Sequence, residues 1–324
     1  MGNGSDVGNG SGSRNGSDSR NGSGREERER QMKERLGMIG IGMMGHGIAG
    51  NLLKHGYRLT VLEHPGNQPL DALLAAGATT ARSARAVASE SEVVILCVTG
   101  SAQVEAALTG PDGVIVGLRP GAVVIDCSTA VPAATVRMAQ AVSARGGRMI
   151  DAAMTRTPKE AAEGRLNLLV GGDLEVLERC RPILASFAES ITSVGRIGAG
   201  HRMKLLHNFV SLGQVTLLAE AAACARTAEI DPAVFLEVLA TGGGGGTALE
   251  RLRPFLESGD TAGLRFAISN GRKDLDYYVA MVTDAGNRHA VADAILATLD
   301  SAVDAGHGDE LMPELVTFLA GDRR

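Results

Sequence analysis

The sequence predicts an α/β fold, a doubly wound parallel sheet, followed by an all-α domain. Three observations support this prediction. From Leu36 to about Val194, short apolar runs alternate with helix-like segments, which is the pattern of parallel strands joined by crossover helices. A glycine-rich turn separates the first of these strands from the first helix. After Gly198 the strand-like runs stop and only helical patterns follow.

Changes in sequence pattern along the chain divide its 324 residues into three parts. Residues 1–34 are a low-complexity tail in which N-G-S recurs every six residues, and we expect this polar segment to be disordered. Residues 35–196 form the sheet domain and residues 197–324 the helical domain. We expect the first helix of the helical domain to border a crevice between the two.

Each element of the sheet domain is predicted from its apolar period and its length. In chain order, the predicted strands are Leu36–Ile39, Tyr57–Leu62, Ala78–Thr80, Val93–Val98, Val123–Asp126, a run beginning at Met149–Asp151, Leu166–Val170 and Ile191–Val194. The first helix follows Gly45, with Ile48, Leu52 and Leu53 at helical spacing, and the later ones are Leu70–Ala76, Ala84–Ser89, Gln103–Leu108, Pro132–Arg145 and Leu174–Ala185.

The helical domain opens with a long Ala- and Leu-rich helix from Met203 to about Ala228. Further helices are predicted at Pro232–Leu239, Thr247–Arg253, Lys273–Asp284, Ala290–Ala305 and Glu310–Leu319. Helix-rich halves of this kind often need a partner surface, so we expect a homodimer or a homotetramer.

Composition excludes several classes of function. The formal net charge of −5 provides no basic field for nucleic acid or an anionic membrane, and the absence of Trp argues against stacking platforms for single strands. No apolar run approaches the length of a membrane span, and the N-terminus lacks the apolar core of a signal peptide. We therefore expect a cytoplasmic protein with neither nucleic acid nor a membrane as its partner.

The four cysteines are scattered along the chain, at Cys97, Cys127, Cys180 and Cys224. Two of them fall in apolar strand-like runs and are interpreted as small buried hydrophobic residues. We expect neither a disulfide nor a metal site.

The glycine-rich turn has the spacing G-x-G-x-x-G, formed by Gly40, Gly42 and Gly45. The first glycine permits a tight turn, the second lets the backbone approach a pyrophosphate, and the third lets the helix pack closely on the strand. Backbone N–H groups of Met43 and Met44 open the new helix, where its positive dipole end favours phosphate. With a strand before it and a helix after it, this turn predicts dinucleotide binding rather than a purely structural loop.

Glu63 ends the second strand, about 20 residues after the glycine turn, where a carboxylate accepts both ribose hydroxyls of an adenosine. A carboxylate there repels a 2′-phosphate, so NAD is favoured as the cofactor, with NADP as the alternative. His64 and Arg58 moderate that preference.

Two polar clusters follow strands of the sheet. Asp126-Cys127-Ser128-Thr129 comes directly after a strand, where a hydroxyl either touches a ligand in the crevice or caps the next helix. The segment from Asp151 to Lys159 contains Thr155, Arg156 and Thr157. Its hydroxyls and guanidinium suit a carboxylate or sulfonate, although a charged surface loop has the same composition.

Two further clusters lie in the helical domain. Lys204, His207 and Asn208 share one face of the long helix, and a lysine desolvated there can exchange protons near neutral pH. The alternative is a solvated polar face. Arg272-Lys273-Asp274 opens a later helix, where a cation reaches a cofactor or forms a surface ion pair.

Together these motifs resemble the β-hydroxyacid dehydrogenase family, which includes 3-hydroxyisobutyrate dehydrogenase and tartronate semialdehyde reductase. The similarity runs from Leu36 to about Leu319 and covers the glycine turn, D-C-S-T, the loop opening at Asp151, G-x-G-x-x-x-K and K-D-L, in the family's order. It implies a Rossmann-type, NAD-binding first domain and a helical second domain for substrate binding and dimerisation.

The resemblance also implies roles for individual residues. Lys204 looks like the family's general acid/base, and Asn208 like an amide that orients the substrate. Thr129 and Lys273 look like positions that contact the cofactor.

This chain departs from the family in two places. The family commonly has Ser-Gly-Gly where this chain has Thr155-Arg156-Thr157, and often has Asn where this chain has His207. An Arg-Thr pair in the loop is similar to the sulfolactaldehyde reductase branch, where the arginine holds a sulfonate. His207 replaces an amide of that branch's pocket, so the sulfonate remains one alternative.

The expected function is an NAD-dependent oxidoreductase that interconverts a short anionic 3-hydroxy acid and its semialdehyde. Lys204 transfers the proton, and Thr155, Arg156 and His207 with Asn208 bind the acid. The alternatives are a sulfolactaldehyde reductase, an imine reductase on the same scaffold, and a non-catalytic NAD(P)-binding protein. Imine reductases usually lack a lysine at this position, and Lys204 with Asn208 disfavours the non-catalytic alternative.

Overall fold

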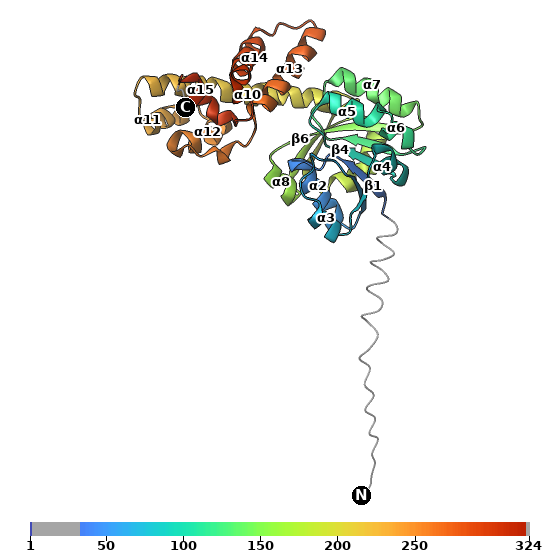
Figure 1. Ribbon diagram of the computed structural model, residues 1–324. Coiled ribbons are helices and arrows are strands. Elements are labelled where there is room, and N and C mark those ends of the chain that lie inside the picture. Colours follow the sequence, from blue (N-terminus) through green and yellow to red (C-terminus); the bar gives the residue numbers. More distant parts are fainter. Residues whose placement is uncertain (2–32, 322–324) are drawn as a thin grey trace.

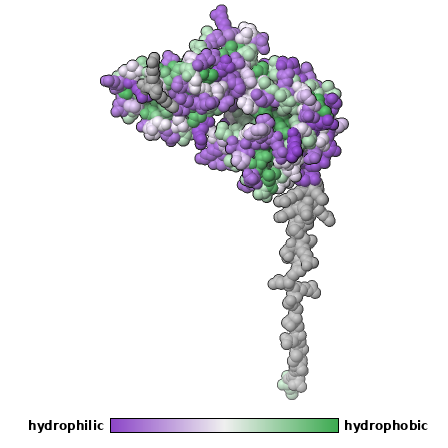
Figure 2. Space-filling model, viewed as in Figure 1, coloured by the Kyte–Doolittle hydropathy of each residue, from purple (hydrophilic) through white to green (hydrophobic). Residues whose placement is uncertain are grey.

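The computed structural model describes residues 33–321 together with Met1. Most of the predicted tail, residues 1–34, therefore lies outside the described residues. Figure 1 shows a sheet with its covering helices on one side and a group of helices on the other, with the long helix α10 (Ala199–Thr227) running from the first into the second. Hydrophilic and hydrophobic residues are intermixed over the face shown in Figure 2.

The sheet has eight strands in the order β3-β2-β1-β4-β5-β6-β7-β8. All pairs from β3 to β6 are parallel, as predicted, but β7 runs antiparallel to β6, and β8 is parallel to β7. The strands are β1 (Arg35–Ile39), β2 (Arg58–Leu62), β3 (Thr79–Ala81), β4 (Val93–Leu96), β5 (Val123–Asp126), β6 (Arg148–Thr155), β7 (Leu166–Gly171) and β8 (Ala188–Gly195).

The reversal at β7 corrects the expectation of a wholly parallel sheet. Only ten residues separate β6 from β7, and they contain the short helix α8 (Pro158–Glu163), which the sequence analysis missed. A parallel return needs a crossover of a dozen or more residues, so this connection turns the chain back instead.

Helices cover both faces of the sheet, which confirms the doubly wound arrangement. Side chains of α2, α3, α8 and α9 pack in one hydrophobic core, and side chains of α4 to α7 pack in another on the opposite face. The helices not yet given bounds are α2 (Met43–Lys54), α3 (Asp71–Ala75), α4 (Ala84–Glu90), α5 (Ser101–Thr109), α6 (Val114–Gly117), α7 (Pro132–Ser143) and α9 (Leu174–Leu184).

The second part of the chain is helical, as predicted, and has its own core. Besides α10 it contains α11 (Pro232–Thr241), α12 (Thr247–Ser258), α13 (Ile268–Asp284), α14 (Ala290–Ala302) and α15 (Leu315–Leu319). The predicted helix Glu310–Leu319 is only partly helical, because Leu311 first pairs with Ala267 in an isolated bridge and a 3₁₀ turn at Met312–Glu314 precedes α15.

Within residues 33–321, α10 is the one helix long and apolar enough to cross a membrane by length and composition. More than half of its most apolar window, 56%, is buried inside the protein. That burial is typical of the core helix that joins two parts of a globular protein.

Candidate active site

The glycine turn between β1 and α2 leaves room for a phosphate group. Gly40 has φ +97°, and a Cβ there would lie 2.2 Å from the carbonyl oxygen of Cys97. Gly42, by contrast, faces open space, with nothing within 4 Å of a built Cβ. Gly42 is also the N-cap of α2 and has no side chain to occupy the first N–H groups, while no acidic residue lies in the first turn. The residues present therefore fit a dinucleotide pyrophosphate at this helix end.

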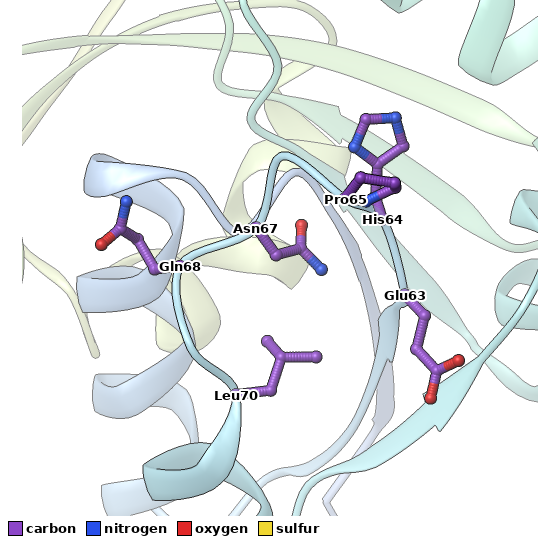
Figure 3. Close-up of a pocket in the computed structure, with 6 residues that line it drawn as sticks. All are labelled: Glu63, His64, Pro65, Asn67, Gln68 and Leu70. Atoms are coloured by element: carbon purple, nitrogen blue, oxygen red, sulfur yellow. The ribbon is translucent and has the colours of Figure 1, made fainter.

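Glu63 lies beside a hollow of about 430 Å³ at the end of β2, lined by Glu63, His64, Pro65, Asn67, Gln68 and Leu70 (Figure 3). Its carboxylate accepts a hydrogen bond from the Thr80 hydroxyl at 2.7 Å and lies 3.9 Å from Arg82. The loop is tied to the glycine turn, because the backbone of Gln68 donates to the carbonyl of Ile41 at 2.7 Å. This hollow next to the turn has the place and the acidic group that an adenosine ribose requires.

Ser128, in the D-C-S-T segment after β5, fastens two strand ends together. The backbone N–H of Val98, after β4, donates to the Ser128 hydroxyl at 3.0 Å, and the Ser128 N–H donates to Asp126 at 3.0 Å. Neither hydroxyl of the segment caps α7, whose N-cap is Val131 without a side-chain bond. In the part of the chain that the structure describes, the half-buried Thr129 hydroxyl has no hydrogen-bond partner, so it is available to a ligand.

The start of α10 is held on the sheet by Asp151 of β6. This buried carboxylate accepts the N–H groups of Gly198 and His201, each at 2.7 Å. The approach is close, since a Cβ at Gly200 would lie 2.3 Å from the carbonyl oxygen of Leu169 in β7. Burial raises the pKa of Asp151, while the neighbouring imidazole of His201 and the two N–H donors act to lower it.

Lys204 lies one turn further along α10. Its half-buried amine has a pKa lowered from 10.5 to about 8, chiefly because burial disfavours the charged form. The positive charges of Lys273 and Arg251 lower this pKa as well, whereas the carboxylate of Asp274 raises it. The predicted lysine is therefore desolvated, and its amine can both give and take a proton near neutral pH.

His207 and Asn208, three and four residues after Lys204 on α10, are hydrogen-bonded to each other and onward to Asp274. The ring Nδ1 of His207 lies 3.0 Å from Oδ1 of Asn208, and the Asn208 amide donates to Asp274 of α13 at 2.6 Å. Burial lowers the pKa of His207, and the neighbouring positive charges of Lys204 and Arg251 add to the effect. Asn208 is buried and Lys204 half-buried, whereas His207 is exposed, so this polar face is only partly solvated.

Lys273 is bound to the same carboxylate. Its amine donates to Asp274 at 2.6 Å and lies over the ring of Tyr277, 5.1 Å from the centroid. Asp274 is 3% exposed, so the expected surface ion pair is instead a buried one. Arg272, its neighbour, forms the surface pair, with Asp300 at 2.7 Å.

Tyr277 connects this group to the sheet domain. Its hydroxyl accepts the backbone N–H of Ser101, the first residue of α5, at 3.1 Å. A Cβ built on Gly100 would lie 2.6 Å from that hydroxyl and 3.5 Å from Cδ of Lys273. Through these contacts the helical domain brings Lys273 to the loop after β4, beside the strand ends that line the ligand crevice in this kind of sheet.

The predicted substrate loop is engaged elsewhere. Arg156 donates to the carboxylate of Glu189 in β8 and to the carbonyl of Arg165. The Thr157 hydroxyl and N–H both donate to Glu160 in a capping box at the start of α8. Thr155, the last residue of β6, pairs with Asn167. None of these hydrogen bonds and strand pairings involves Lys204 or Asn208, so the substrate role of the three residues stays a prediction.

The sequence analysis did not identify Arg251 of α12, although it influences both Lys204 and His207. Its side chain is half-buried and forms no hydrogen bond or ion pair within residues 33–321. No motif marks this residue, because its place depends on how α12 packs against α10. An unpaired, half-buried guanidinium suits a carboxylate or a sulfonate.

The structure also bears on metal and thiol chemistry. In the described residues, no group of three or more His, Cys, Asp or Glu side chains is placed to hold a metal ion. All four cysteines are unpaired. Burial raises the pKa values of Cys97 and Cys180 to about 12, so these thiols stay protonated.

Two family models together match nearly all of the described chain. Residues 35–195 match the NAD binding domain of 6-phosphogluconate dehydrogenase. Residues 198–319 match the model described as NAD-binding of NADP-dependent 3-hydroxyisobutyrate dehydrogenase.

Individual relatives agree with these models. An NAD-dependent L-serine dehydrogenase of Pseudomonas aeruginosa is 35% identical over 222 residues, which are 68% of this chain and 74% of that protein. A 3-sulfolactaldehyde reductase of Escherichia coli is 36% identical over 187 residues, 58% of this chain and 62% of the relative. A crystal structure of 3-hydroxyisobutyrate dehydrogenase from Salmonella typhimurium superposes with a TM-score of 0.78 at 28% identity, covering 88% of this chain and all of that one.

Proposed function

This chain belongs to the β-hydroxyacid dehydrogenase family and is an NAD(P)-dependent oxidoreductase that acts on hydroxyl groups; from that premise we propose that it interconverts a short anionic 3-hydroxy acid and its semialdehyde, with Lys204 as general acid/base. The observation that carries the proposal is the Lys204 amine, whose pKa is lowered to about 8. It lies beside the amide of Asn208 and at the helix that joins the two domains.

The roles of the residues follow from their chemistry. A nicotinamide cofactor, when bound, would supply the hydride for the carbonyl carbon in reduction and take it up from the alcohol carbon in oxidation. In reduction the Lys204 ammonium gives its proton to the carbonyl oxygen, and in oxidation the neutral amine takes the proton of the hydroxyl. Asn208, held by Asp274, is oriented to hydrogen-bond the same substrate oxygen or its neighbour. Charge and protons balance in both directions.

The cofactor residues are proposed from the sheet domain and from α13. Gly40, Gly42 and Gly45 with the backbone of Met43 and Met44 form the pyrophosphate site. The ribose binds at Glu63, and Thr129 and Lys273 face the nicotinamide end. The carboxylate of Glu63 favours NAD over NADP, because a 2′-phosphate there meets a negative charge, partly offset by Arg82.

The acid group of the substrate requires a cation, and two arginines are candidates. Arg156 must first leave Glu189, whereas Arg251 has no such partner among the described residues and already acts on Lys204. We assign the substrate carboxylate to Arg251 together with His207, and leave Arg156 with Thr155 and Thr157 for a second acidic group, such as a sulfonate.

Assembly and location complete the proposal. Four exposed apolar side chains, those of Met203, Leu206, Val210 and Leu217, lie along one side of α10. A second copy of the chain covers this stripe in a homodimer or a homotetramer. The enzyme acts in the cytoplasm on small molecules, away from nucleic acid and membranes.

A substrate panel with a matched lysine control tests the proposal. NADH and NADPH oxidation is followed with sulfolactaldehyde, tartronate semialdehyde and methylmalonate semialdehyde, and NAD reduction with L-serine and 3-hydroxyisobutyrate. For the best substrate, Lys204→Met lowers kcat by about 10²–10⁴ and leaves NADH binding intact. Lys54→Met, at the exposed end of α2, leaves kcat unchanged. Full activity in Lys204→Met, or turnover of a cyclic imine alone, contradicts the proposal.

A further inference from the structure

Two buried carboxylates lie side by side under the first turn of α10. Asp126 of β5 and Asp151 of β6 are register partners on neighbouring parallel strands, and both are 0% exposed. Residues in register on adjacent strands point to the same face of a sheet. Both side chains therefore meet the same helix, and Gly171 of β7 continues the row at the point where Gly200 touches the sheet.

His201 is the residue of α10 that faces this pair. It is 0% exposed, its backbone N–H donates to Asp151 at 2.7 Å, and its ring Nδ1 lies 2.7 Å from the hydroxyl of Thr135 in α7. Nε2 of the same ring points to Oδ2 of Asp126 at 3.9 Å. In the described part of the chain, these last two atoms are the buried side-chain polar atoms without a hydrogen-bond partner.

Leaving these two atoms unpaired is unfavourable, because a polar atom in a protein interior has given up its hydrogen bonds to water without replacing them. Nε2 of His201 is the ring atom that faces Asp126, so a hydrogen bond between the two would satisfy both atoms. The charged and titratable groups that face His201 are Asp126 and Asp151. Its imidazole is thus the side chain placed to compensate two neighbouring carboxylates.

We infer that His201 is a positioning residue, which through its hydrogen bonds to Thr135 and Asp151 and its approach to Asp126 fixes the first turn of α10 and thereby the place of the Lys204 amine. His201 and Lys204 are three residues apart, so they stand one above the other on the helix. The other end of the connection is Ser128, which binds both Asp126 and the backbone of Val98 at the end of β4. Hydrogen bonds thus run from the end of β4 through Ser128 to Asp126, and the 3.9 Å contact between Asp126 and His201 continues this line of side chains to the proton-transferring helix.

The positioning role of His201 rests on the proposed function, because it concerns the amine of Lys204. Its test does not need the substrate. The first readout is the pH dependence of acetylation of Lys204 by acetic anhydride, quantified by peptide mass spectrometry, which reports the pKa of the amine. The second is the dissociation constant of NADH from fluorescence. Where a substrate has been found, kcat and KM are measured as a third readout.

Two pairs of variants separate positioning from packing. His201→Phe keeps the ring volume but loses both nitrogens, whereas His201→Gln carries an amide about as far as Nε2. Thr135→Val and Thr216→Val make the same change at buried threonines that each bond the carbonyl four residues earlier, and only Thr135 also touches His201.

In the wild type, Lys204 titrates near its lowered pKa of about 8. In His201→Phe and Thr135→Val we expect this midpoint to rise by about one pH unit or more, because a released helix turn admits water to the amine. His201→Gln and Thr216→Val keep the wild-type midpoint, and NADH affinity stays within about twofold in all four. With a substrate, kcat falls at least tenfold in His201→Phe at constant KM.

An unchanged midpoint in both His201→Phe and Thr135→Val overturns the inference. Equal effects of His201→Phe and His201→Gln also overturn it, because they indicate packing rather than a hydrogen bond. If His201→Phe does not fold, the comparison of the Lys204 midpoint in Thr135→Val with that in Thr216→Val decides the inference. Failure of every substrate in the panel contradicts the proposed function and leaves the acetylation result standing.

Discussion

The charge on Lys204 depends on burial and on three neighbouring charged residues, whose effects on its pKa differ in direction. Burial, Lys273 and Arg251 destabilise its ammonium form, and the carboxylate of Asp274 is the one group that stabilises it. Since burial and two positive charges together outweigh Asp274, the pKa falls to about 8. An amine in this range serves both directions of the proposed reaction.

We predict opposite pH profiles for the two directions. Oxidation needs the neutral amine, so its kcat rises as the pH passes about 8 and then levels off. Reduction needs the ammonium form, so its kcat falls above the same pH. Initial rates between pH 6 and 10 measure both profiles.

Asp274→Asn provides the control for this prediction. It removes the group that raises the pKa of Lys204, so both midpoints move to lower pH. Midpoints that move to higher pH would contradict the assigned cause.

The two arginines near the site are distinguished by their partners. We predict that Arg251→Gln raises the KM for the acid substrate by about tenfold to a hundredfold, in keeping with one lost charge-assisted contact. NADH binding stays unchanged. It also raises the pKa of Lys204, because one of the positive charges that lower it is gone.

Arg156→Ala is the matched comparison. If Arg156 stays with Glu189 during turnover, the variant changes KM little; if it binds a second acidic group, KM rises for sulfolactaldehyde and not for 3-hydroxyisobutyrate. A larger effect of Arg156→Ala than of Arg251→Gln on every substrate would overturn our assignment of the carboxylate.

Among the elements, α10 is the one whose exact seating determines the site. A Cβ on Gly200 would lie 2.3 Å from a carbonyl oxygen of β7 and 2.7 Å from Oδ2 of Asp151. Neither the carbonyl oxygen of Leu169 nor the buried carboxylate of Asp151 can move freely aside. The helix must therefore shift to accommodate a Cβ at Gly200. Close packing of α10 on the sheet therefore explains why the second glycine of the G-x-G-x-x-x-K pattern, Gly200, has no side chain.

We predict that Gly200→Ala lowers the free energy of unfolding by about 1–3 kcal/mol and kcat with it. Gly50→Ala in α2 is the control, because nothing lies within 4 Å of its Cβ and Ala stabilises a helix interior by about 0.5–1 kcal/mol. Urea unfolding and initial rates measure the two effects. A Gly200→Ala enzyme as stable as the Gly50→Ala enzyme would contradict the close seating.

The elements differ in how far the sequence reveals them. Apolar runs and the glycine spacing predict the strands from Arg35 to Asp126 and the first helix, because local pattern and turn chemistry agree there. Strand direction has no local signature, so the reversal of β7 follows only from the short connection through α8. The helix α8 itself was missed because its six residues hold little periodicity.

The site is less visible in the sequence than the sheet. Lys204, Asn208 and Lys273 stand in recognisable motifs, but what binds them does not. Asp274 meets Asn208 across 66 residues, and Arg251 reaches Lys204 through helix packing. The orientation of the Arg156 side chain is likewise set by its bond to Glu189. The two residues are 33 positions apart, and no sequence motif connects them.

On the scale of the whole molecule, the exposed apolar side chains along α10 form a surface that a second protein chain can cover. Its most exposed members are Val210 at 55% and Leu217 at 72%. Successive members are three, four and seven residues apart, so they share one side of the helix. Contiguous apolar surface of this kind commonly marks an interface between protein chains.

We predict that Leu217→Lys reduces the molar mass in solution, measured by light scattering after size exclusion, from that of an oligomer toward the 33.4 kDa of one chain. A lysine in a packed apolar interface is buried without a partner, which disfavours association. Leu174→Lys is the matched control, since Leu174 is 63% exposed and lies on α9, away from the stripe. A monomeric wild type would contradict the proposed assembly.

The hydroxyl of Tyr277 has a consequence for how this enzyme can be divided. It supplies the acceptor for the first N–H of α5, whose own N-cap, Gly100, has no side chain. A fragment that ends at the domain boundary lacks Tyr277 and therefore lacks that acceptor. We expect the first turn of α5 to fray in such a fragment, which also lacks the neighbouring Lys273. We therefore expect the isolated fragment to bind the coenzyme more weakly than the intact polypeptide does.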